Sequence, residues 1–257
     1  MTTDNTMQTI SRAISILKSF SRDDRELSLA DFHHRLGLSK SSLQRILSTL
    51  VSQGFLEKDN EKKTYKLGIE LYYLGNLVEE HSHLLRIVKP YLILVRDKTN
   101  ENVYLNIIEN DLRKCIALEE AKHDLMTISY VGQTSPLYAG ASAKLLLAYL
   151  TADEIQLYLE NMEKEKITNV TKTERDELVE EIRFINQNGY AISYGERVPG
   201  VCSVSVPLYN RWNKVIASLS ISAPLSRVDD DIVSNFIQIL RETSKSINEE
   251  LRFVSQD

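Results

Sequence analysis

The first third of the chain carries apolar residues at helical spacing, separated by short polar breaks. Apolar positions at i, i+3, i+4 and i+7 predict an amphipathic helix over residues 9–20. Ser28, with Asp31 three residues later, has the pattern of a helix N-cap, and Gly37 allows the left-handed conformation that ends a helix. Ser39 then begins a third, longer helix that is apolar on one side. A short helix, a glycine turn and a longer helix are typical of a helix-turn-helix motif.

The residues that follow predict a wing and a linker helix. Residues 54–57 and 64–67 have the composition of two short strands, and the polar residues 58–63 between them fit the turn of a hairpin. Residues 7–68 are therefore predicted to form a winged helix-turn-helix domain. Residues 69–82 predict a further helix whose apolar stripe is larger than a solvated linker needs, so we expect this helix to pack against a partner.

From residue 83 onward, the pattern changes to mixed helices and strands. A helix over residues 84–99 contains Pro90, which should kink the helix or mark a late start. The remaining elements are strands over 102–109 and 112–119, helices over 141–150, 153–161 and 174–188, strands over 191–194, 201–207 and 215–222, and a final helix from Ser226 to about Phe253. The candidate N-caps are Thr151 with Glu154, Thr173 with Asp176, and Ser226 with Asp229. This order indicates an antiparallel sheet with helices packed on it, so residues 83–257 are predicted to be an α+β domain.

The composition narrows the class of protein. The chain has 257 residues, enough for two ordinary domains that bury their cores without disulfides or a structural metal. Its two cysteines, Cys115 and Cys202, form no disulfide framework and fit a reducing compartment. The first residues lack the basic and apolar regions of a signal peptide, and no apolar run reaches the ~18 residues that span a bilayer. We therefore expect a cytoplasmic protein without membrane contact.

The net charge of −5 is an average over two segments of opposite sign. Residues 1–68 hold 11 Lys and Arg against 8 Asp and Glu, which gives +3. Residues 69–257 hold the other 20 Lys and Arg with 28 Asp and Glu, which gives −8. The asymmetry suggests that the first segment meets an anion and that the second has another task, although a small excess on a short segment also arises by chance.

The third helix presents polar and basic side chains opposite its apolar side. No acidic residue occurs between Leu38 and Leu56. Gln and Arg can hydrogen bond to adenine and guanine in the major groove, while Lys, Ser and helix N-termini bind phosphates. The alternative is an ordinary solvated helix face beside a lysine-rich hairpin. The predicted DNA contacts are Ser39, Lys40, Ser41, Ser42, Gln44, Arg45, Lys58, Lys62 and Lys63, with Arg12 or Arg35 added if either side chain turns toward the duplex.

Two late strands each present a row of small hydroxyls. Alternation places Ser203 and Ser205 on one face of their strand. On the next strand it places Ser218, Ser220 and Ser222 together. Such rows suit a cavity lined with donors for a carboxylate or carbonyl, closed by a helix start whose free N–H groups favour an anion. The alternative is a solvent-facing sheet surface rich in serine.

The sequence also contains fragments of catalytic motifs, none of them complete. Ser15 and Lys18 match S-x-x-K, but the companion motifs of that enzyme class are missing. The segment Gly140–Lys144 lacks the last glycine of a G-x-S-x-G elbow and the apolar strand before it. Acidic residues and histidines at positions 79–83 could ligate a metal, although a solvated cluster at a helix end is more common. We therefore expect no catalytic activity, no metal and no cofactor.

A long stretch of the chain resembles one known family. The segment SLADFHHRLGLSKSSLQRILSTLVSQGFLEKDNEKKTYKLGIELYYLG is similar to the winged helix-turn-helix and linker helix of the IclR family of bacterial transcriptional regulators. Further segments in the family's order are Pro136–Lys144, Asn188–Ala191, Gly195–Glu196, Gly200–Val201 and Leu219–Pro224. The resemblance extends from about Met7 to Phe253. It departs at Ala143, where the family often has Gly, and at Tyr138, where it often has His, and both positions leave the identity of the effector open.

The resemblance implies a fold and a role for the second domain. That domain should be GAF-like and should bind a small organic acid, a carboxylate, that changes the affinity for double-stranded operator DNA. Homodimers that pair into tetramers are implied too, with repression as the commoner role. An activator, or an adaptor that binds another protein and senses nothing, are the alternatives. The family's effector positions fall on Ala141, Ser142, Ser193, Ser203, Ser220 and Ser222, while Cys202 beside them should point into the core.

Overall fold

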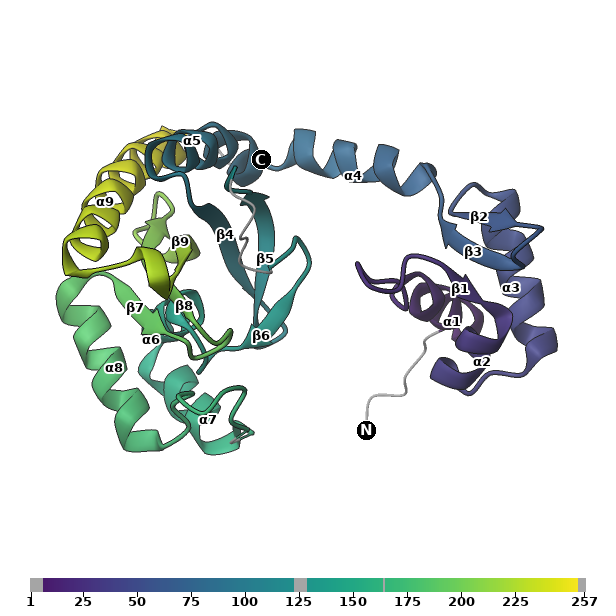
Figure 1. Ribbon diagram of the computed structural model, residues 1–257, viewed down its shortest axis with the longest axis horizontal. Coiled ribbons are helices and arrows are strands. Elements are labelled where there is room, and N and C mark those ends of the chain that lie inside the picture. Colours follow the sequence, from purple (N-terminus) through teal and green to yellow (C-terminus); the bar gives the residue numbers. More distant parts are fainter. Residues whose placement is uncertain (1–6, 123–128, 164, 254–257) are drawn as a thin grey trace. The chain divides into compact units, whose positions relative to one another are not determined.

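The computed structural model describes residues 7–122, 129–163 and 165–253. Its internal contacts divide the chain into two compact units, Met1–His81 and Ser82–Asp257 (Figure 1). Each unit has its own hydrophobic core. Within the described residues, no helix has the length and apolar character needed to cross a bilayer.

The first unit combines three short helices with a small sheet. The helices are α1 (Gln8–Leu17), α2 (Leu29–Leu36) and α3 (Lys40–Ser52), and the antiparallel sheet has the order β1 (Leu27–Ser28), β3 (Thr64–Leu67), β2 (Leu56–Asp59). Each helix contributes to one core, in which Phe32 of α2 and Leu47 of α3 are fully buried. The winged helix-turn-helix expected from the sequence is confirmed. The sheet gains β1, a strand too short for periodicity to reveal.

Local hydrogen bonds determine where α2 and α3 begin and end. Ser28 Oγ accepts a hydrogen bond from the Asp31 N–H at 3.3 Å, and the Ser28 N–H donates to Asp31 Oδ2 at 2.7 Å, which completes a capping box. Gly37 ends α2 with φ of 65°, a conformation that glycine adopts at little cost. Ser39 Oγ accepts from the Ser42 N–H at 3.3 Å at the start of α3. The helix-turn-helix therefore rests on short-range contacts.

The substitution Ser28→Ala should destabilise α2 by about 1 kcal/mol, because it removes the N-cap hydrogen bond. Amide hydrogen exchange in α2 should then be roughly 5-fold faster, since exchange follows local opening. Ser48→Ala is the matched control: Ser48 is exposed on α3, and its side chain makes no hydrogen bond with the described residues. Unchanged exchange in Ser28→Ala would contradict the role given to this cap.

Gly68 joins the wing to helix α4 (Glu70–His81) where two backbone segments touch. The Gly68 N–H donates to the carbonyl oxygen of Phe55 at 2.8 Å. A Cβ atom at position 68 would lie 2.0 Å from the carbonyl oxygen of Gly54, well inside van der Waals contact. Only glycine therefore lets the segment before α4 lie against the turn that follows α3.

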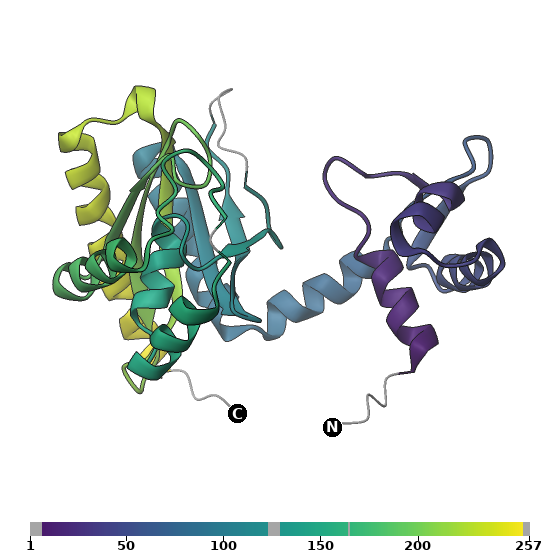
Figure 2. The same cartoon turned by 90° about the horizontal axis from the view of Figure 1, so that it is seen from below.

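Helix α4 buries none of its residues. It is continuous, and in the described part of its unit no other element packs along it (Figure 2). The large apolar side chains on α4 and just before it are 42–66% exposed, and they are Ile69, Tyr72, Tyr73, Leu74, Leu77 and Val78. The apolar stripe expected from the sequence is thus present, and it is uncovered in the single chain.

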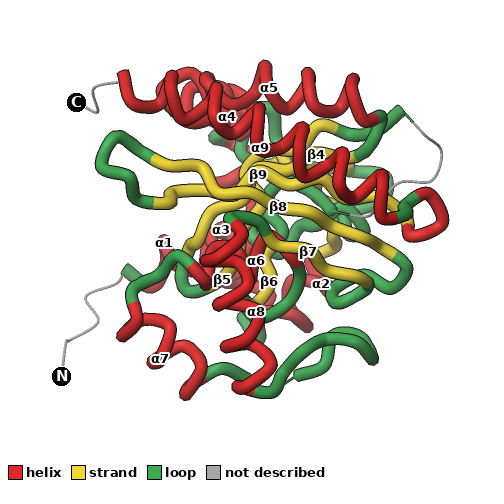
Figure 3. The backbone as a smooth tube through the Cα atoms, turned by 90° about the vertical axis from the view of Figure 1, so that its left-hand side faces the viewer, coloured by secondary structure: helices red, strands yellow, loops and turns green. Residues whose placement is uncertain are grey.

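A six-stranded antiparallel sheet forms the centre of the second unit. Its strand order is β6 (Thr134–Pro136), β5 (Leu112–Glu119), β4 (Asn102–Glu109), β9 (Val215–Pro224), β8 (Val201–Tyr209), β7 (Ala191–Tyr194). Figure 3 shows α5 (His83–Thr99) and α9 (Asp230–Phe253) on one side of the sheet, and α6 (Ala141–Ala148) with α8 (Arg175–Asn188) on the other. Helix α7 (Ala152–Asn161) joins α6 and α8. The predicted α+β class with an antiparallel sheet is confirmed.

Alternation along the central strands separates an apolar face from a polar face. Leu105 of β4, Val204 of β8 and Leu219 of β9 are fully buried in a core shared with α5 and α9. Cys202 lies in the same core, as expected from its position in the alternation. The intervening residues of these strands belong to the opposite face, where serines gather.

Two of the predicted N-caps are wrong. Helix α8 begins after Glu174 with no side-chain cap, so the cap expected at Thr173 is absent. Helix α9 is capped by Asp229, whose Oδ1 accepts from the Ile232 N–H at 2.8 Å. Ser226 lies instead in a short 3-10 turn that precedes the helix. Both segments contain several residues in succession that could cap a helix. Which of them precedes the helix depends on the path of the chain, and the local sequence pattern does not determine that path.

Other element boundaries differ from expectation by a few residues. Helix α1 ends at Leu17, earlier than expected, and β8 and β9 continue to Tyr209 and Pro224. Pro90 lies inside a helix that is continuous from His83, so a late start of α5 is wrong. Strand β6 was not expected, because three residues carry no periodic pattern.

Candidate functional site

Helix α3 buries one side and exposes a basic side that has no acidic residue. Leu43 and Leu47 are fully buried, whereas Lys40, Gln44 and Arg45 are exposed. Among the described residues, these three exposed side chains have no hydrogen-bond or ion-pair partner. They are therefore available to a ligand, and the N-terminus of α3 adds N–H donors that favour a phosphate.

The serines at the start of α3 differ in availability. Ser39 is the N-cap, and its hydroxyl accepts a hydrogen bond from the N–H of Ser42, so Ser39 stabilises the helix itself. Ser41 is exposed, with its Oγ 3.3 Å from Ser39 Oγ, and Ser42 is half-buried. Of the three predicted hydroxyl contacts, Ser41 is the most accessible.

The lysines of the wing are partly engaged by neighbouring side chains. Lys62 Nζ lies 3.2 Å from Glu26 Oε2, and Lys58 Nζ lies 6.0 Å from the centre of the Tyr65 ring. Lys63 is exposed in the hairpin turn with φ of 55°. Lys62 would exchange a carboxylate for a phosphate on binding DNA, whereas Lys63 could bind directly.

Arg12 lies beside the exposed face of α3, and Arg35 is held elsewhere. Arg12 lines a groove between α1 and α3 together with Ser41 and Arg45. Arg35 Nη2 lies 2.9 Å from Asp24 Oδ1 in an ion pair. Arg12 therefore belongs with the basic residues of this face, and Arg35 does not.

In the second unit, the polar face of the sheet borders a cavity beside the start of α6. The cavity is small, with a volume of ≈ 30 Å³. Strands of the sheet, the first turn of α6 and the loop after β7 supply its lining. The structure brings together here all the positions expected to bind the effector, which are Ala141, Ser142, Ser193, Ser203, Ser220 and Ser222.

A chain of hydrogen bonds crosses the polar face of the sheet. Arg113 Nε donates to Ser135 Oγ at 2.9 Å, and Arg113 Nη1 donates to Asn106 Oδ1 at 3.0 Å. Asn106 Nδ2 donates to Ser220 Oγ at 3.4 Å, and Ser205 Oγ donates to the same hydroxyl at 2.7 Å. The chain connects β6 to β8, so the polar groups of this face hold one another in place.

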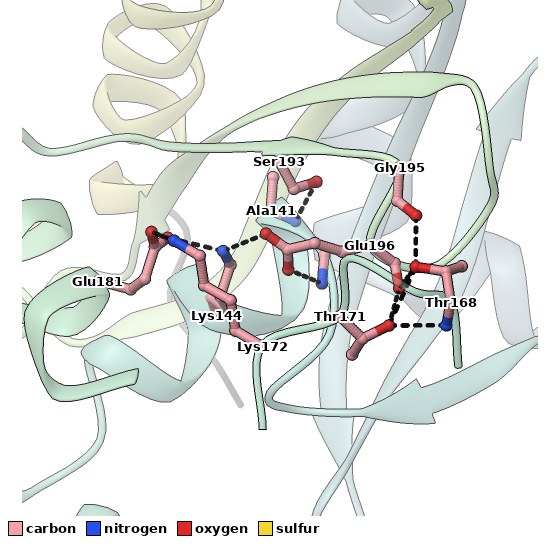
Figure 4. Close-up of polar contacts among 10 residues, drawn as sticks. Ala141, Lys144, Thr168, Thr171, Lys172, Glu181, Ser193, Gly195 and Glu196 are labelled. Atoms are coloured by element: carbon pink, nitrogen blue, oxygen red, sulfur yellow. Dashed lines mark hydrogen bonds and ion pairs between the residues drawn. The ribbon is translucent and has the colours of Figure 1, made fainter. Parts of the chain in front are cut away.

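Two of the amides that open α6 are already satisfied. The Gly140 N–H donates to Glu196 Oε2 at 3.1 Å, and the Ala141 N–H donates to Ser193 Oγ at 3.0 Å (Figure 4). The N–H of Ser142 and that of the next residue have no partner among the described residues. Ser142 lines the cavity, so the first turn of α6 offers unused donors at a position where the helix dipole favours negative charge.

A buried ion cluster fixes α6 to the loop after β7. The Lys144 side chain is 1% exposed, and its Nζ lies 2.6 Å from both Glu196 Oε1 and Glu181 Oε2. Lys172 pairs with the other oxygen of Glu181 (Figure 4). Burial would raise the pKa of Glu181, but Lys144 and Lys172 outweigh burial and hold this pKa below its ordinary value. Because Glu196 also lines the cavity, the cluster connects the cavity to α8.

Reasoning from the sequence missed the two guanidinium groups of the cavity. Arg113 on β5 and Arg197 in the loop after β7 both belong to the lining. Arg113 is 1% exposed, and burial, followed by the positive charge of Arg197, lowers its pKa to about 10. The sequence signal that could have identified Arg113 is its position within the alternating pattern of the predicted strand 112–119. The other lining residues, outside the positions expected to bind the effector, are Tyr104, Asn106, Ser129, Gly140, Glu196, Val198 and Val201.

The residues considered as nucleophiles lack a catalytic setting. Cys115 and Cys202 are buried, and burial raises the pKa of both thiols, to about 11 for Cys202. Ser15 Oγ donates to the carbonyl oxygen of Ser11 in its own helix at 3.0 Å. Across the residues that the structure describes, no three His, Cys, Asp or Glu side chains gather as metal ligands.

Comparison with known protein families matches both units. The family model of the IclR helix-turn-helix domain matches residues 9–60. The family model of the C-terminal domain of the bacterial transcriptional regulator IclR matches residues 77–249. The two matches follow the order of the two units along the chain.

Full-length proteins resemble the chain over both units. The HTH-type transcriptional regulator XynR of Escherichia coli (strain K12) is 30% identical over 249 residues, which cover 96% of this chain and 98% of XynR. A crystal structure of an IclR transcriptional regulator from Alicyclobacillus acidocaldarius is 26% identical, with a TM-score of 0.87, and the match covers 95% of this chain and 99% of that one. An IclR homologue from Microbacterium hydrocarbonoxydans, crystallised with 4-hydroxybenzoate, is 22% identical with a TM-score of 0.84 over 96% and 100% of the two chains.

Proposed function

Because this chain belongs to the IclR family of bacterial transcriptional regulators, we propose that it is a repressor that binds operator DNA as a dimer and responds to a small organic acid. The observation that carries the proposal is the exposed face of α3. Lys40, Gln44 and Arg45 lie there without partners among the described residues, on a helix surface that has no acidic residue. A helix placed in the major groove needs such a surface.

The residues of this face divide the work of binding. Gln44 and Arg45 have the geometry to read base edges, with Gln directed to adenine and Arg to guanine. Lys40 and Ser41 lie near the N-terminus of α3, where phosphates bind, and Lys63 on the wing reaches an adjacent stretch of backbone. Phosphate contacts position the domain on the duplex, and base contacts select the sequence.

A second copy of the chain is needed for tight binding. A single winged helix buries too little surface for a specific site, so a dimer that reads two half-sites is proposed. The uncovered apolar side chains of α4, among them Tyr73 and Leu77, supply the surface on which two copies meet. Pairing of such dimers into tetramers is the further assembly that the family resemblance implies.

Selection of duplexes from a random-sequence pool by the purified full-length chain tests this function. We expect an enriched site of near-palindromic sequence, with half-sites whose centres are one or more helical turns of DNA apart, roughly 10 base pairs or a multiple. Sedimentation of the complex then shows whether two or four copies bind. An unenriched pool, or an enriched site without symmetry, would contradict the proposed dimer on DNA.

The cavity of the second unit is proposed as the effector site. Its lining is rich in donors: serine hydroxyls, two guanidinium groups and the N–H of Ser142, which has no partner among the described residues. Donors of this kind bind carboxylates. The homologue from Microbacterium hydrocarbonoxydans was crystallised with 4-hydroxybenzoate, itself a small organic acid, and this supports the same class of ligand for the present chain. The narrow free space favours a compact acid.

The acid can change DNA affinity only by binding one arrangement of the dimer better than another. The proposed route begins at Ser142 and Glu196, which both line the cavity. Glu196 holds Lys144 of α6, and Lys144 holds Glu181 of α8, so a ligand that moves the loop after β7 also moves these helices. In the dimer, such a shift would alter the separation of the two wings.

The double substitution Ser220→Ala/Ser222→Ala should weaken binding of the acid by roughly 10-fold, because two hydroxyls leave the lining and one hydrogen bond to a charged group is worth about 1.5 kcal/mol or more. Isothermal titration of the full-length chain with a panel of small organic acids measures the affinity. Ser234→Ala, on the exposed side of α9, is the matched control. Equal affinity of the double variant and the wild type for the acid would contradict the proposal that the acid binds at Ser220 and Ser222.

Repression is proposed over activation because it needs the fewest contacts. A dimer bound across a promoter excludes polymerase by occupancy alone, whereas an activator needs a further surface that polymerase recognises. An adaptor that senses nothing would bind neither a selected duplex nor an acid. Duplex selection and acid titration that both fail would therefore favour the adaptor, and binding in either would contradict it. Acting on chromosomal DNA, the protein would work in the cytoplasm.

A further inference from the structure

Arg113 places a buried positive charge in the cavity, and no carboxylate of the described residues pairs with it. Its side chain donates to Ser135 Oγ and Asn106 Oδ1, which are both neutral. Its remaining nitrogen, Nη2, is buried and has no hydrogen-bond partner among the described residues. An unmet donor on a buried charge costs free energy unless a ligand satisfies it. The side chain is therefore arranged to receive an anion.

A second guanidinium borders the same space. The Cβ atom of Arg197 lies beside Gly140, the residue that precedes α6. A Cβ atom built on Gly140 would be 3.9 Å from it. Arg197 Nη1 reaches across to Gln133 Oε1, next to β6, at 3.2 Å. In the described part of the chain this neutral oxygen is its partner, and no carboxylate pairs with it. Burial lowers the pKa of Arg197, as it does that of Arg113. Arginine side chains nevertheless remain positively charged in proteins.

The acidic residue of the lining does not offset these charges. Both carboxylate oxygens of Glu196 are already engaged: Oε1 accepts from Lys144 Nζ and Oε2 accepts from the Gly140 N–H. Lys144, Lys172, Glu181 and Glu196 together carry two positive and two negative charges, so the cluster is neutral as a whole. The cavity is left with two positive charges and with the free amides at the start of α6.

We infer that the ligand of this cavity is a short dicarboxylic acid, with one carboxylate at the amides that follow Ala141 and the other between Arg113 and Arg197. The inference rests on the proposed function, in which this cavity is the effector site. A dianion neutralises both guanidinium groups and satisfies Arg113 Nη2, while a monocarboxylate leaves one buried charge unmatched. The lining that the structure describes offers many donors and no uncommitted carboxylate, which fits a ligand whose oxygens are mainly acceptors.

Calorimetric titration of the full-length chain, without DNA and at constant ionic strength, tests the ligand class. The probes are malonate, succinate and glutarate, each compared with the monocarboxylate of equal carbon number: propionate, butyrate and pentanoate. We expect at least one dicarboxylate to bind roughly 10- to 100-fold more tightly than its monocarboxylate, the range of one charge-assisted hydrogen bond.

Variants of the two arginines test the assignment of the second carboxylate. Arg113→Met should reduce the preference for the dicarboxylate over its monocarboxylate to less than about 3-fold, since a neutral side chain of similar length replaces the charge that the second carboxylate would meet. Arg197→Gln lies at a less buried position and should do the same, which keeps the test decisive if Arg113→Met does not fold. Arg183→Gln, exposed on α8, removes the same charge away from the cavity and should bind like the wild type.

The outcomes separate this inference from the function on which it rests. Equal affinity for the two series in the wild type overturns the dicarboxylate and leaves the effector cavity in place. Binding of inorganic phosphate, with loss in Arg113→Met and no binding of dicarboxylates, overturns it in favour of a single dianionic group. Absence of binding in both series overturns the inference together with the proposed effector site. A preference that survives in both arginine variants overturns the placement of the second carboxylate.

Discussion

Arg45→Glu is expected to weaken operator binding by ~100-fold or more while leaving the fold intact. Each of two copies loses a contact worth about 1–3 kcal/mol and brings a carboxylate toward the phosphates. Arg45 is exposed, and its side chain has no partner among the described residues, so thermal unfolding should not change. Fluorescence anisotropy with the selected duplex, repeated over a range of salt concentrations, gives both the affinity and its salt dependence.

The salt dependence distinguishes a DNA contact from an indirect effect. Loss of a phosphate contact in each of two copies lowers the slope of log affinity against log salt by roughly 2. Loss of a base contact instead relaxes the preference at one position of each half-site. Lys18→Glu makes the same charge reversal on an exposed residue after α1 and serves as the control. Unchanged affinity and an unchanged slope in Arg45→Glu would argue for the adaptor rather than the regulator.

Lys144→Met should destabilise the second unit by about 3–5 kcal/mol. The substitution leaves Glu196 buried and takes from Glu181 one of its two cations, and breaking one partner of a buried ion pair costs this much. Urea denaturation followed through Trp212, the single tryptophan of the chain, reports on this unit. Methionine keeps the length of the side chain, so most of the effect is the lost charge.

Two further variants separate the buried pair from its exposed neighbour. Lys172→Met removes the partner that is 39% exposed and should cost less than about 1 kcal/mol. Lys144→Met/Glu196→Gln removes the unpaired charge and should regain part of the lost stability. If Lys144→Met and Lys172→Met cost the same, the buried pair does not have the role assigned to it.

The pH dependence of the Lys144→Met effect follows from Glu181. Its pKa in the folded protein lies below the ordinary value of 4.5, with burial raising it and the lysines lowering it by more. Such a group stabilises the fold above pH 4.5, and this contribution is lost as the pH falls through the lower, folded pKa. The difference in unfolding free energy between wild type and Lys144→Met should therefore be largest near neutral pH and should shrink below pH 4.5.

Features of the fold that depend on neighbours in sequence could be predicted. The two residues of a capping box are only three positions apart, as Ser28 and Asp31 are, and Thr151 and Glu154. Both capping boxes occur as expected. The hairpin of β4 and β5 has the predicted bounds, because Asn110 and Asp111 adopt the left-handed conformation that its tight turn requires. Serines placed on one face by alternation do meet: Ser205 Oγ and Ser220 Oγ are 2.7 Å apart, as are Ser203 Oγ and Ser222 Oγ.

The cations of the cavity could not be predicted in the same way. Arg113 contacts Asn106 and Ser135 because β5 lies between β4 and β6 in the sheet. No local sequence pattern predicts this order of strands. Arg197 enters the cavity from a loop after β7, a strand at the opposite edge of the sheet from β6. A serine row could be read as a polar surface of the sheet. The charge that distinguishes a ligand site from such a surface came from residues far apart in the chain.

The close approach at Gly68 determines where two regulators of this kind can be recombined. Any side chain at position 68 would collide with the carbonyl oxygen of Gly54, so the wing and α4 are fitted to each other as one piece. A hybrid that takes its DNA-binding part from one protein and its sensor from another should therefore be joined at His81 and Ser82, where the compact units divide. A junction before α4 would bring together two backbones that were never matched at this contact.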